Sequence, residues 1–188
     1  MKRFLIGLCL IAASGCSIDS LREFENKEDV TGPALVAQKQ AFDGGCLTYV
    51  FEGKPLADVM AAMPNAKSIP VKESGSPTAT AAWRVGDRNS VIVMQLPNGV
   101  ACSASVMYGD PQRLSDAAVD MIQARGAFTK GKVDTSERGD AERTAWCTAG
   151  PYPYVVAIYR RTTGTRVAFL ANVFKAQGAA LSSCQPGS

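Results

Sequence analysis

The 188-residue sequence contains no histidine, and this absence narrows the chemistry open to it. Histidine is the side chain whose ordinary pKa best suits a general base near neutral pH, and it is the commonest metal ligand. Without it, Ser-His and Cys-His catalytic pairings are excluded, and a zinc site would depend on cysteine and carboxylate ligands alone. Serine–lysine and carboxylate chemistry remain open, but the balance favours a protein that is not an enzyme.

The chain also lacks a long apolar segment, a charge surplus and any Cys-x-x-Cys motif. Its N-terminal apolar run, residues 4–11, is shorter than the roughly 20 residues that a membrane-spanning helix needs. The 20 basic and 17 acidic residues nearly balance, which gives no electrostatic basis for binding nucleic acid. The cysteine spacing indicates neither a redox pair nor a zinc knuckle. We therefore expect no cofactor, no metal site and no nucleic-acid partner.

The N-terminus has the three parts of a secretory signal. A basic pair, Lys2-Arg3, precedes the apolar residues 4–11, and small side chains follow before a cleavage point. We expect residues 1–15 to be removed as a signal peptide. The mature chain then keeps 18 of the 20 basic residues against 17 acidic ones, a net charge of +1.

The residues at the cleavage point, Ala13-Ser14-Gly15-Cys16, resemble the lipobox of bacterial lipoproteins, in which the cysteine carries diacylglycerol. The first lipobox position is usually leucine and is here Ala13, so ordinary signal-peptidase cleavage after Gly15 is the alternative. Five cysteines follow the cut, and an odd number would leave one thiol unpaired in an oxidising compartment. Lipidation of Cys16 leaves four, enough for two bridges. Ser17 resembles the signal that sorts lipoproteins to the outer membrane, so we expect a lipid anchor on its periplasmic face in a Gram-negative bacterium.

Three regions follow the signal. Residues 16–33 are polar and charged, as expected of a tether between the lipid and a folded domain. Residues 34–108 predict a helix over 34–50 that Gly44-Gly45 weakens, a short helix after Pro55, a connector over 69–78, and strands over 79–85, 90–96 and 100–107. Residues 109–188 predict a helix from the N-cap Asp110 to Gly126, a charged connector over 129–142, strands around Trp146, over 154–161 and over 165–174, and a frayed tail from Gly178.

The two regions share one order, a helix followed by three strands. An internal duplication would produce this order, although short α-then-β units also arise by chance. In either case the fold class is α+β, with helices packed on antiparallel β-sheet in two tandem α-then-βββ units.

The four remaining cysteines, Cys46, Cys102, Cys147 and Cys184, are expected to form structural disulfides. Of the three possible pairings we favour Cys46–Cys102 and Cys147–Cys184. The first would fasten the leading helix to the first group of strands. The second would tie the tail to the second group.

Three further groups of residues are candidates for function. Tyr152, Tyr154 and Tyr159 gather around a strand start, where edge-strand packing competes with a protein-contact patch. Trp83 and Trp146 are more typical of core anchors than of ligand platforms. Acidic residues alternate with lysine and arginine between the helix that ends at Gly126 and the Trp146 strand. Their spacing fits no calcium loop, so we interpret them as a solvated loop: Asp134, Glu137, Asp140 and Glu142.

The Cys46 helix, Ala82-Trp83, Leu96-Pro97-Asn98-Gly99 and Cys102-Ser103 resemble an uncharacterised family of small proteobacterial envelope proteins and lipoproteins. The resemblance covers roughly the first half of the mature chain and implies no activity. The order of helices and strands also resembles the small lipoprotein subunit of the outer-membrane β-barrel assembly machinery and the β-lactamase-inhibitor fold, a likeness of topology alone.

We therefore expect a non-enzymatic accessory module that binds another envelope protein through an exposed apolar or aromatic patch on one sheet. The alternative is a periplasmic small-ligand carrier or a histidine-independent hydrolase, which would have a deep pocket with converging polar groups. A lysine and a serine in hydrogen-bond contact within such a pocket would favour the hydrolase.

Overall fold

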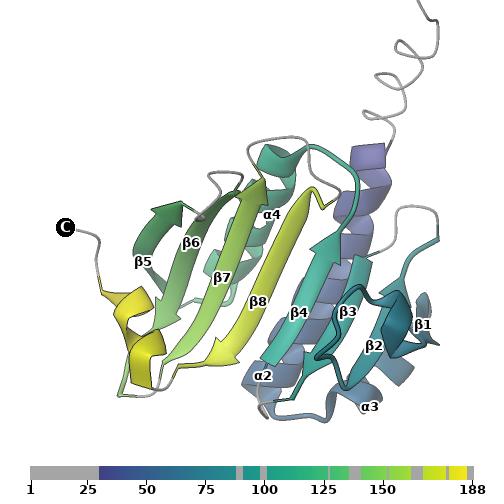
Figure 1. Cartoon of the computed structure of the whole chain (residues 1–188), viewed down its shortest axis with the longest axis horizontal. Coiled ribbons are helices and arrows are strands. Elements are labelled where there is room, and N and C mark those ends of the chain that lie inside the picture. Colours follow the sequence, from purple (N-terminus) through teal and green to yellow (C-terminus); the bar gives the residue numbers. More distant parts are fainter. Residues whose placement is uncertain are drawn as a thin grey trace, which may run out of the picture.

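The structure is a computed structural model that describes residues 30–87, 91–97, 101–126, 128–135, 141–151, 153–161, 167–176 and 178–185. Its centre is one antiparallel sheet of eight strands in the order β1-β2-β3-β4-β8-β7-β6-β5, with the main helices packed behind it in Figure 1. The expected α+β class is confirmed. The signal peptide, Cys16 and the tether up to residue 29 lie outside the described residues.

The first helical segment is continuous from residue 30 to residue 52. Residues 30–38 are α-helical, η1 (Lys39–Leu47) is a π-helix and α2 (Thr48–Glu52) is α-helical. The expected boundary between tether and helix is therefore wrong, since residues 30–33 are helical. Thr31, in this stretch, is buried and its hydroxyl accepts a hydrogen bond of 3.0 Å from the backbone N–H of Asp110.

The glycine pair within η1 does not break the helix. A Cβ on Gly44 would lie 3.6 Å from Met63 Cε, and a Cβ on Gly45 would lie 3.4 Å from Met60 Sδ. The missing side chains therefore make room for two methionines at and beyond the end of α3 (Leu56–Ala61), which packs closely beside η1. The helix ends at Gly53, whose φ of 66° is a left-handed conformation that favours glycine.

Each half of the chain contributes four strands. The first half supplies β1 (Ala66–Ile69), β2 (Ala81–Val85), β3 (Val91–Leu96) and β4 (Ala101–Val106). The second half supplies β5 (Phe128–Thr135), β6 (Ala141–Thr148), β7 (Tyr154–Arg161) and β8 (Phe169–Lys175). Short 3-10 helices, η2 (Val71–Glu73) and η3 (Gly178–Cys184), follow β1 and β8.

Two of these strands correct the sequence prediction of three strands in each half. The expected connector over 129–142 overlaps nearly all of β5 and the start of β6, and β1 ends at the first residue of the expected connector over 69–78. Both β1 and β5 are edge strands. Edge strands in natural proteins carry charged side chains and bulges that discourage further pairing, and β5 has lysines together with a register shift between Lys130 and Val133. Because such strands carry polar and charged side chains, their sequences do not show the apolar pattern that predicts a strand.

The helix of the second half, α4 (Pro111–Ala124), begins and ends as expected. The Asp110 carboxylate accepts a hydrogen bond of 3.0 Å from the Arg113 backbone N–H, and proline occupies the first turn. Leu114, Ala118 and Ile122 are fully buried on one face of α4.

The two halves share one sheet and one core. Their last strands, β4 and β8, pair in antiparallel register at the centre, with Cys102 opposite Val173. Phe42 of the first half and Phe169 of the second are both fully buried, and their rings meet edge to face at 6.5 Å. Trp83 and Trp146 lie on the second strand of each half.

Both expected disulfide pairings are confirmed. Cys46–Cys102, the core disulfide, joins η1 to β4, and both cysteines are fully buried. Cys147–Cys184, the tail disulfide, joins β6 to η3. The tail up to residue 185 is consequently not frayed, because η3 is tied to the second half of the sheet.

Candidate functional site

The tyrosines predicted as a contact patch do not share a face. Tyr154 and Tyr159 are five residues apart on β7, so their side chains point to opposite sides of the sheet. The Tyr154 ring packs in the helix layer, 5.0 Å from the ring of Phe51. The Tyr159 ring lies on the other face under the guanidinium of Arg143, at 5.9 Å. Tyr152 lies outside the described residues.

The described residues also show no broad apolar patch on the sheet. Their exposed large apolar side chains belong to four different segments, and Val133 is the one that lies on a strand. The others are Val36, Tyr108 and Leu181.

A hollow of about 590 Å³ lies instead in the helix layer, between η1 and α3; we call it the helix groove. Its lining is mainly apolar, and its polar side chains are Gln40, Thr48, Lys54 and Asp58. Volumes of 300–1,000 Å³ with a few polar groups are typical of binding sites. The full lining is Gln40, Gly44, Thr48, Lys54, Pro55, Asp58, Val59, Ala62, Met63 and Pro64.

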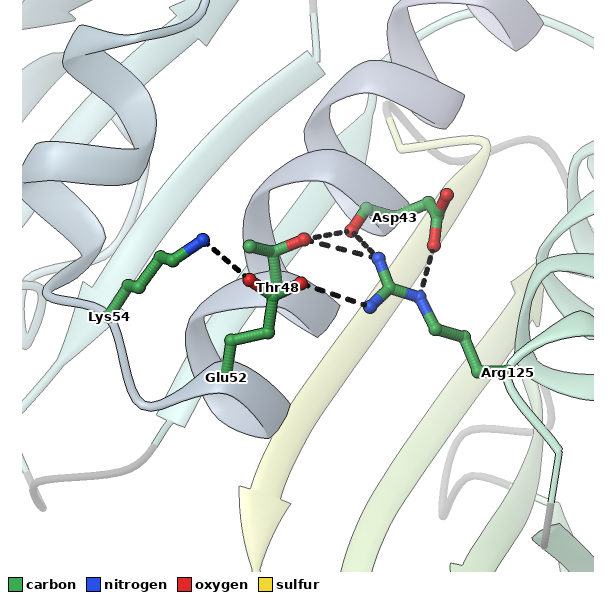
Figure 2. Close-up of polar contacts among 5 residues, drawn as sticks. All are labelled: Asp43, Thr48, Glu52, Lys54 and Arg125. Atoms are coloured by element: carbon green, nitrogen blue, oxygen red, sulfur yellow. Dashed lines mark hydrogen bonds and ion pairs between the residues drawn. The ribbon is translucent and has the colours of Figure 1, made fainter.

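One arginine beside this groove joins the two halves of the helix layer (Figure 2). Arg125, which follows α4, donates from Nε to Asp43 Oδ1 at 2.8 Å and from Nη2 to the Asp43 carbonyl at 2.9 Å. The same Nη2 reaches Thr48 Oγ1 at 3.1 Å, and Thr48 Oγ1 donates to the Asp43 carbonyl at 3.1 Å. Because Thr48 also lines the helix groove, this cluster fixes one wall of the groove to α4.

Glu52 links Arg125 of this cluster to Lys54, whose side chain is exposed at the surface. Lys54 Nζ donates to Glu52 Oε2 at 2.7 Å, and Arg125 Nη1 lies 3.9 Å from Glu52 Oε1. The hydrogen bond and the positive charge of Lys54, with a smaller contribution from Arg125, lower the pKa of the Glu52 carboxyl. The carboxylate therefore stays ionised at neutral pH and holds Lys54 at the edge of the groove.

A second, smaller hollow of about 190 Å³ lies between α4 and the strands β5 to β7; we call it the helix–sheet cavity. Lys130 and Ser115 both line it, yet Ser115 Oγ has no hydrogen-bond partner among the described residues. The Ser–Lys contact that would indicate a hydrolase is therefore not formed there. The full lining is Gln112, Ser115, Asp116, Val119, Lys130, Glu142, Thr144, Trp146, Ile158 and Arg160.

The acidic residues of the expected loop over 129–142 lie partly on strands. Asp134 is paired with Lys132 at 2.8 Å and Arg143 at 3.5 Å, and Glu142 is paired with Arg160 at 3.3 Å. Glu137 and Asp140 lie outside the described residues. Within the described ranges, no three cysteine, aspartate or glutamate side chains are placed to hold a metal ion.

Neither hollow follows from the sequence pattern. The helix groove depends on how η1 and α3 pack around Gly44 and Met63, and the helix–sheet cavity depends on how α4 crosses three strands. In the part of the chain that the structure describes, no helix is long and apolar enough to cross a membrane. No family model, curated protein or solved structure matches this chain.

Proposed function

We propose that the protein is a lipid-anchored envelope protein that binds a short apolar segment of another envelope protein in the helix groove and catalyses no reaction. The observation that supports this is the groove itself, an open and mainly apolar hollow in the helix layer. Exposed concave apolar surface on a folded domain typically marks a contact site.

The chemistry of the lining favours a protein segment as the occupant. A cavity of about 150 Å³ holds one benzene molecule, so 590 Å³ has room for several apolar side chains in a row. Met63 lies in the wall, and its flexible thioether side chain adapts to differently shaped partners. Lys54 and Asp58 add one charge of each sign at the border, as expected for a site that also contacts polar backbone.

The groove is also held rigid from two sides. The core disulfide fixes η1 to β4, and Arg125, which follows α4, is bonded to Asp43 in the middle of η1. A wall that does not reorganise on binding loses less entropy, which favours affinity.

The location proposed for the protein in the cell envelope is based on Cys16 and on the resemblance to envelope lipoproteins. Lipid chains contribute about 0.8 kcal/mol per buried CH₂, so a multiply acylated terminus anchors a domain without a membrane-spanning helix. Replacing Cys16 with serine should move the protein from the membrane fraction to the soluble periplasmic fraction. A Cys16→Ser protein that stays with the membrane would contradict the anchor.

Binding in the groove is testable by site-specific photocrosslinking in intact cells. A photoreactive residue at Ala62, which lines the groove and is exposed, should give one discrete crosslinked product. The same residue at Asp120, exposed on α4, should not give that product.

A matched pair of variants on α3 distinguishes the groove from its surroundings. Val59→Lys places a charge in the lining and should abolish the Ala62 product, whereas Ala57→Lys, on the same helix but outside the lining, should leave it unchanged. No product from position 62, or equal loss in both variants, would overturn the assignment.

A further inference from the structure

The helix–sheet cavity combines one face of α4 with three neighbouring strands. Gln112, Ser115, Asp116 and Val119 recur at the three- and four-residue spacing that puts side chains on one face of a helix. The floor consists of directly paired positions on adjacent strands. These pairs are Lys130 with Trp146, Thr144 with Ile158, and Glu142 with Arg160.

Two buried polar atoms in this cavity have no hydrogen-bond partner in the part of the chain that the structure describes. Ser115 Oγ belongs to a side chain that is only 7 % exposed, and Trp146 Nε1 is buried although its ring is partly accessible. Most buried polar side-chain atoms in proteins are hydrogen-bonded, so each exception needs an explanation. Of the three such atoms found among the described residues, two line this one cavity.

The charged side chains around the cavity differ in whether they have hydrogen-bond or ion-pair partners among the described residues. Arg160 donates to Gln112 Oε1 at 2.6 Å and to Glu142 Oε2 at 3.3 Å, and Gln112 Nε2 donates to Asp116 Oδ1 at 2.8 Å. Lys130 lines the cavity opposite Trp146 and pairs with no other described residue. The lining thus carries two basic and two acidic side chains, and three of its donors are engaged by no other described residue: the Lys130 ammonium, the Trp146 indole N–H and the Ser115 hydroxyl.

We propose that the helix–sheet cavity binds a small monocarboxylate. Its carboxylate oxygens accept hydrogen bonds from Trp146 Nε1, Ser115 Oγ and the ammonium of Lys130. Carboxylates bind such convergent donors with short, charge-assisted hydrogen bonds. This site is separate from the helix groove and does not depend on the function proposed for it.

The lining also limits which anions fit. A volume of 190 Å³ is slightly more than a benzene-binding cavity of about 150 Å³, which restricts the ligand to a short apolar chain or ring beside its carboxylate. Val119 and Ile158 supply apolar contact for that part. The carboxylates of Asp116 and Glu142 repel a second negative charge, so dicarboxylates and phosphate are disfavoured.

Nuclear magnetic resonance of the two indole N–H groups provides a direct test. The mature chain carrying Cys16→Ser, with both disulfides formed, is titrated with butyrate, with its neutral isostere butyramide, and with inorganic phosphate. The Trp146 signal, assigned by its loss in Trp146→Phe, should shift saturably with butyrate alone. The signal of Trp83, which is buried in the core and does not line the cavity, should remain in place.

Two variants test the assigned donors. Lys130→Gln should weaken butyrate binding at least about tenfold, because it replaces a charged donor to the carboxylate with a neutral one. Ser115→Ala should also weaken binding while leaving the thermal stability equal or higher, since an unpartnered buried hydroxyl is removed. No butyrate shift in the millimolar range, equal shifts with butyramide, a shift with phosphate instead, or undiminished binding in Lys130→Gln would each overturn the proposal.

Discussion

Replacing Arg125 with alanine tests whether one side chain joins the helical segments of the two halves. Its guanidinium makes three hydrogen bonds, of 2.8 Å and 2.9 Å to Asp43 and of 3.1 Å to Thr48. These contacts connect positions 77 and 82 residues apart in the sequence. In Figure 2, Arg125 approaches the Asp43 and Thr48 side chains from the opposite side to Lys54.

The size of the effect follows from the exposure of the partners. Hydrogen bonds to charged groups contribute about 1.5–3 kcal/mol each when they are buried. The side chains of Arg125 and Asp43 are 27 % and 31 % exposed, so water replaces part of what is lost. The 3.9 Å pair with the more exposed Glu52 contributes close to nothing. We expect Arg125→Ala to lower the free energy of unfolding by about 2 kcal/mol in total.

The assay is urea and thermal unfolding of the mature Cys16→Ser chain with its disulfides intact. About 2 kcal/mol corresponds to a fall of roughly 4–8 °C in Tm for a domain of this size. The matched control is Arg113→Ala, because Arg113 is an exposed arginine on α4 whose backbone N–H, rather than its guanidinium, bonds to Asp110. If the two variants differ by less than about 0.5 kcal/mol, the range of ordinary surface substitutions, the cluster does not join the halves.

Three further predictions concern the tail, the acidic side chain at the groove and the core disulfide. A Cβ on Gly131 would collide with the backbone oxygen of Ser183 in η3, so Gly131→Ala should displace η3 and make the tail disulfide reducible at lower thiol concentration. Peptide mapping should then find the core disulfide unaffected, and equal protection of the tail disulfide in both proteins would contradict the reasoning. The pKa of Glu52 is lowered in the folded state, so its pairing stabilises the fold above the ordinary carboxyl pKa and is lost as the pH falls through the lowered value. Lys54→Gln should raise the Glu52 titration midpoint measured by nuclear magnetic resonance, and an unchanged midpoint would refute this cause. Replacing both cysteines of the core disulfide with alanine should lower the free energy of unfolding by about 4 kcal/mol, the chain-entropy value for its loop; a loss below about 1 kcal/mol in urea unfolding would count against it.

Much of the fold is predictable because its central elements have strong local signals. Asp110-Pro111 marks the start of α4, and the dense apolar run of β3 marks a strand buried on both faces. Cysteine parity predicts two bridges and leaves three pairings open; the favoured pairing, in which each bridge ties a terminal helix to the strands of its own half, is the one that the structure contains.

The remaining features depend on tertiary contacts that leave no local pattern. The edge strands β1 and β5 need no continuous apolar face because they have one neighbour each. Tyr154 and Tyr159 look like one cluster in the sequence, but the two-residue period of a strand separates them onto opposite faces. The π-helical η1 contains the glycine pair that faces Met60 and Met63, a contact between two neighbouring helices that no residue pattern within either helix reveals.

The two hollows arise because the helices and the sheet pack differently in the two halves of the chain. In the first half, the space between helix and sheet is filled by Phe42, Leu47 and the core disulfide, all fully buried. The hollow therefore lies outside this packing, where the additional helix α3 stands beside η1. Among the described residues of the second half no helix corresponds to α3, and α4 contributes the small polar Ser115 to the cavity lining beside β6. That space remains open and contains polar atoms that no other described residue engages, so the shared architecture of the two halves leaves two hollows of different chemistry.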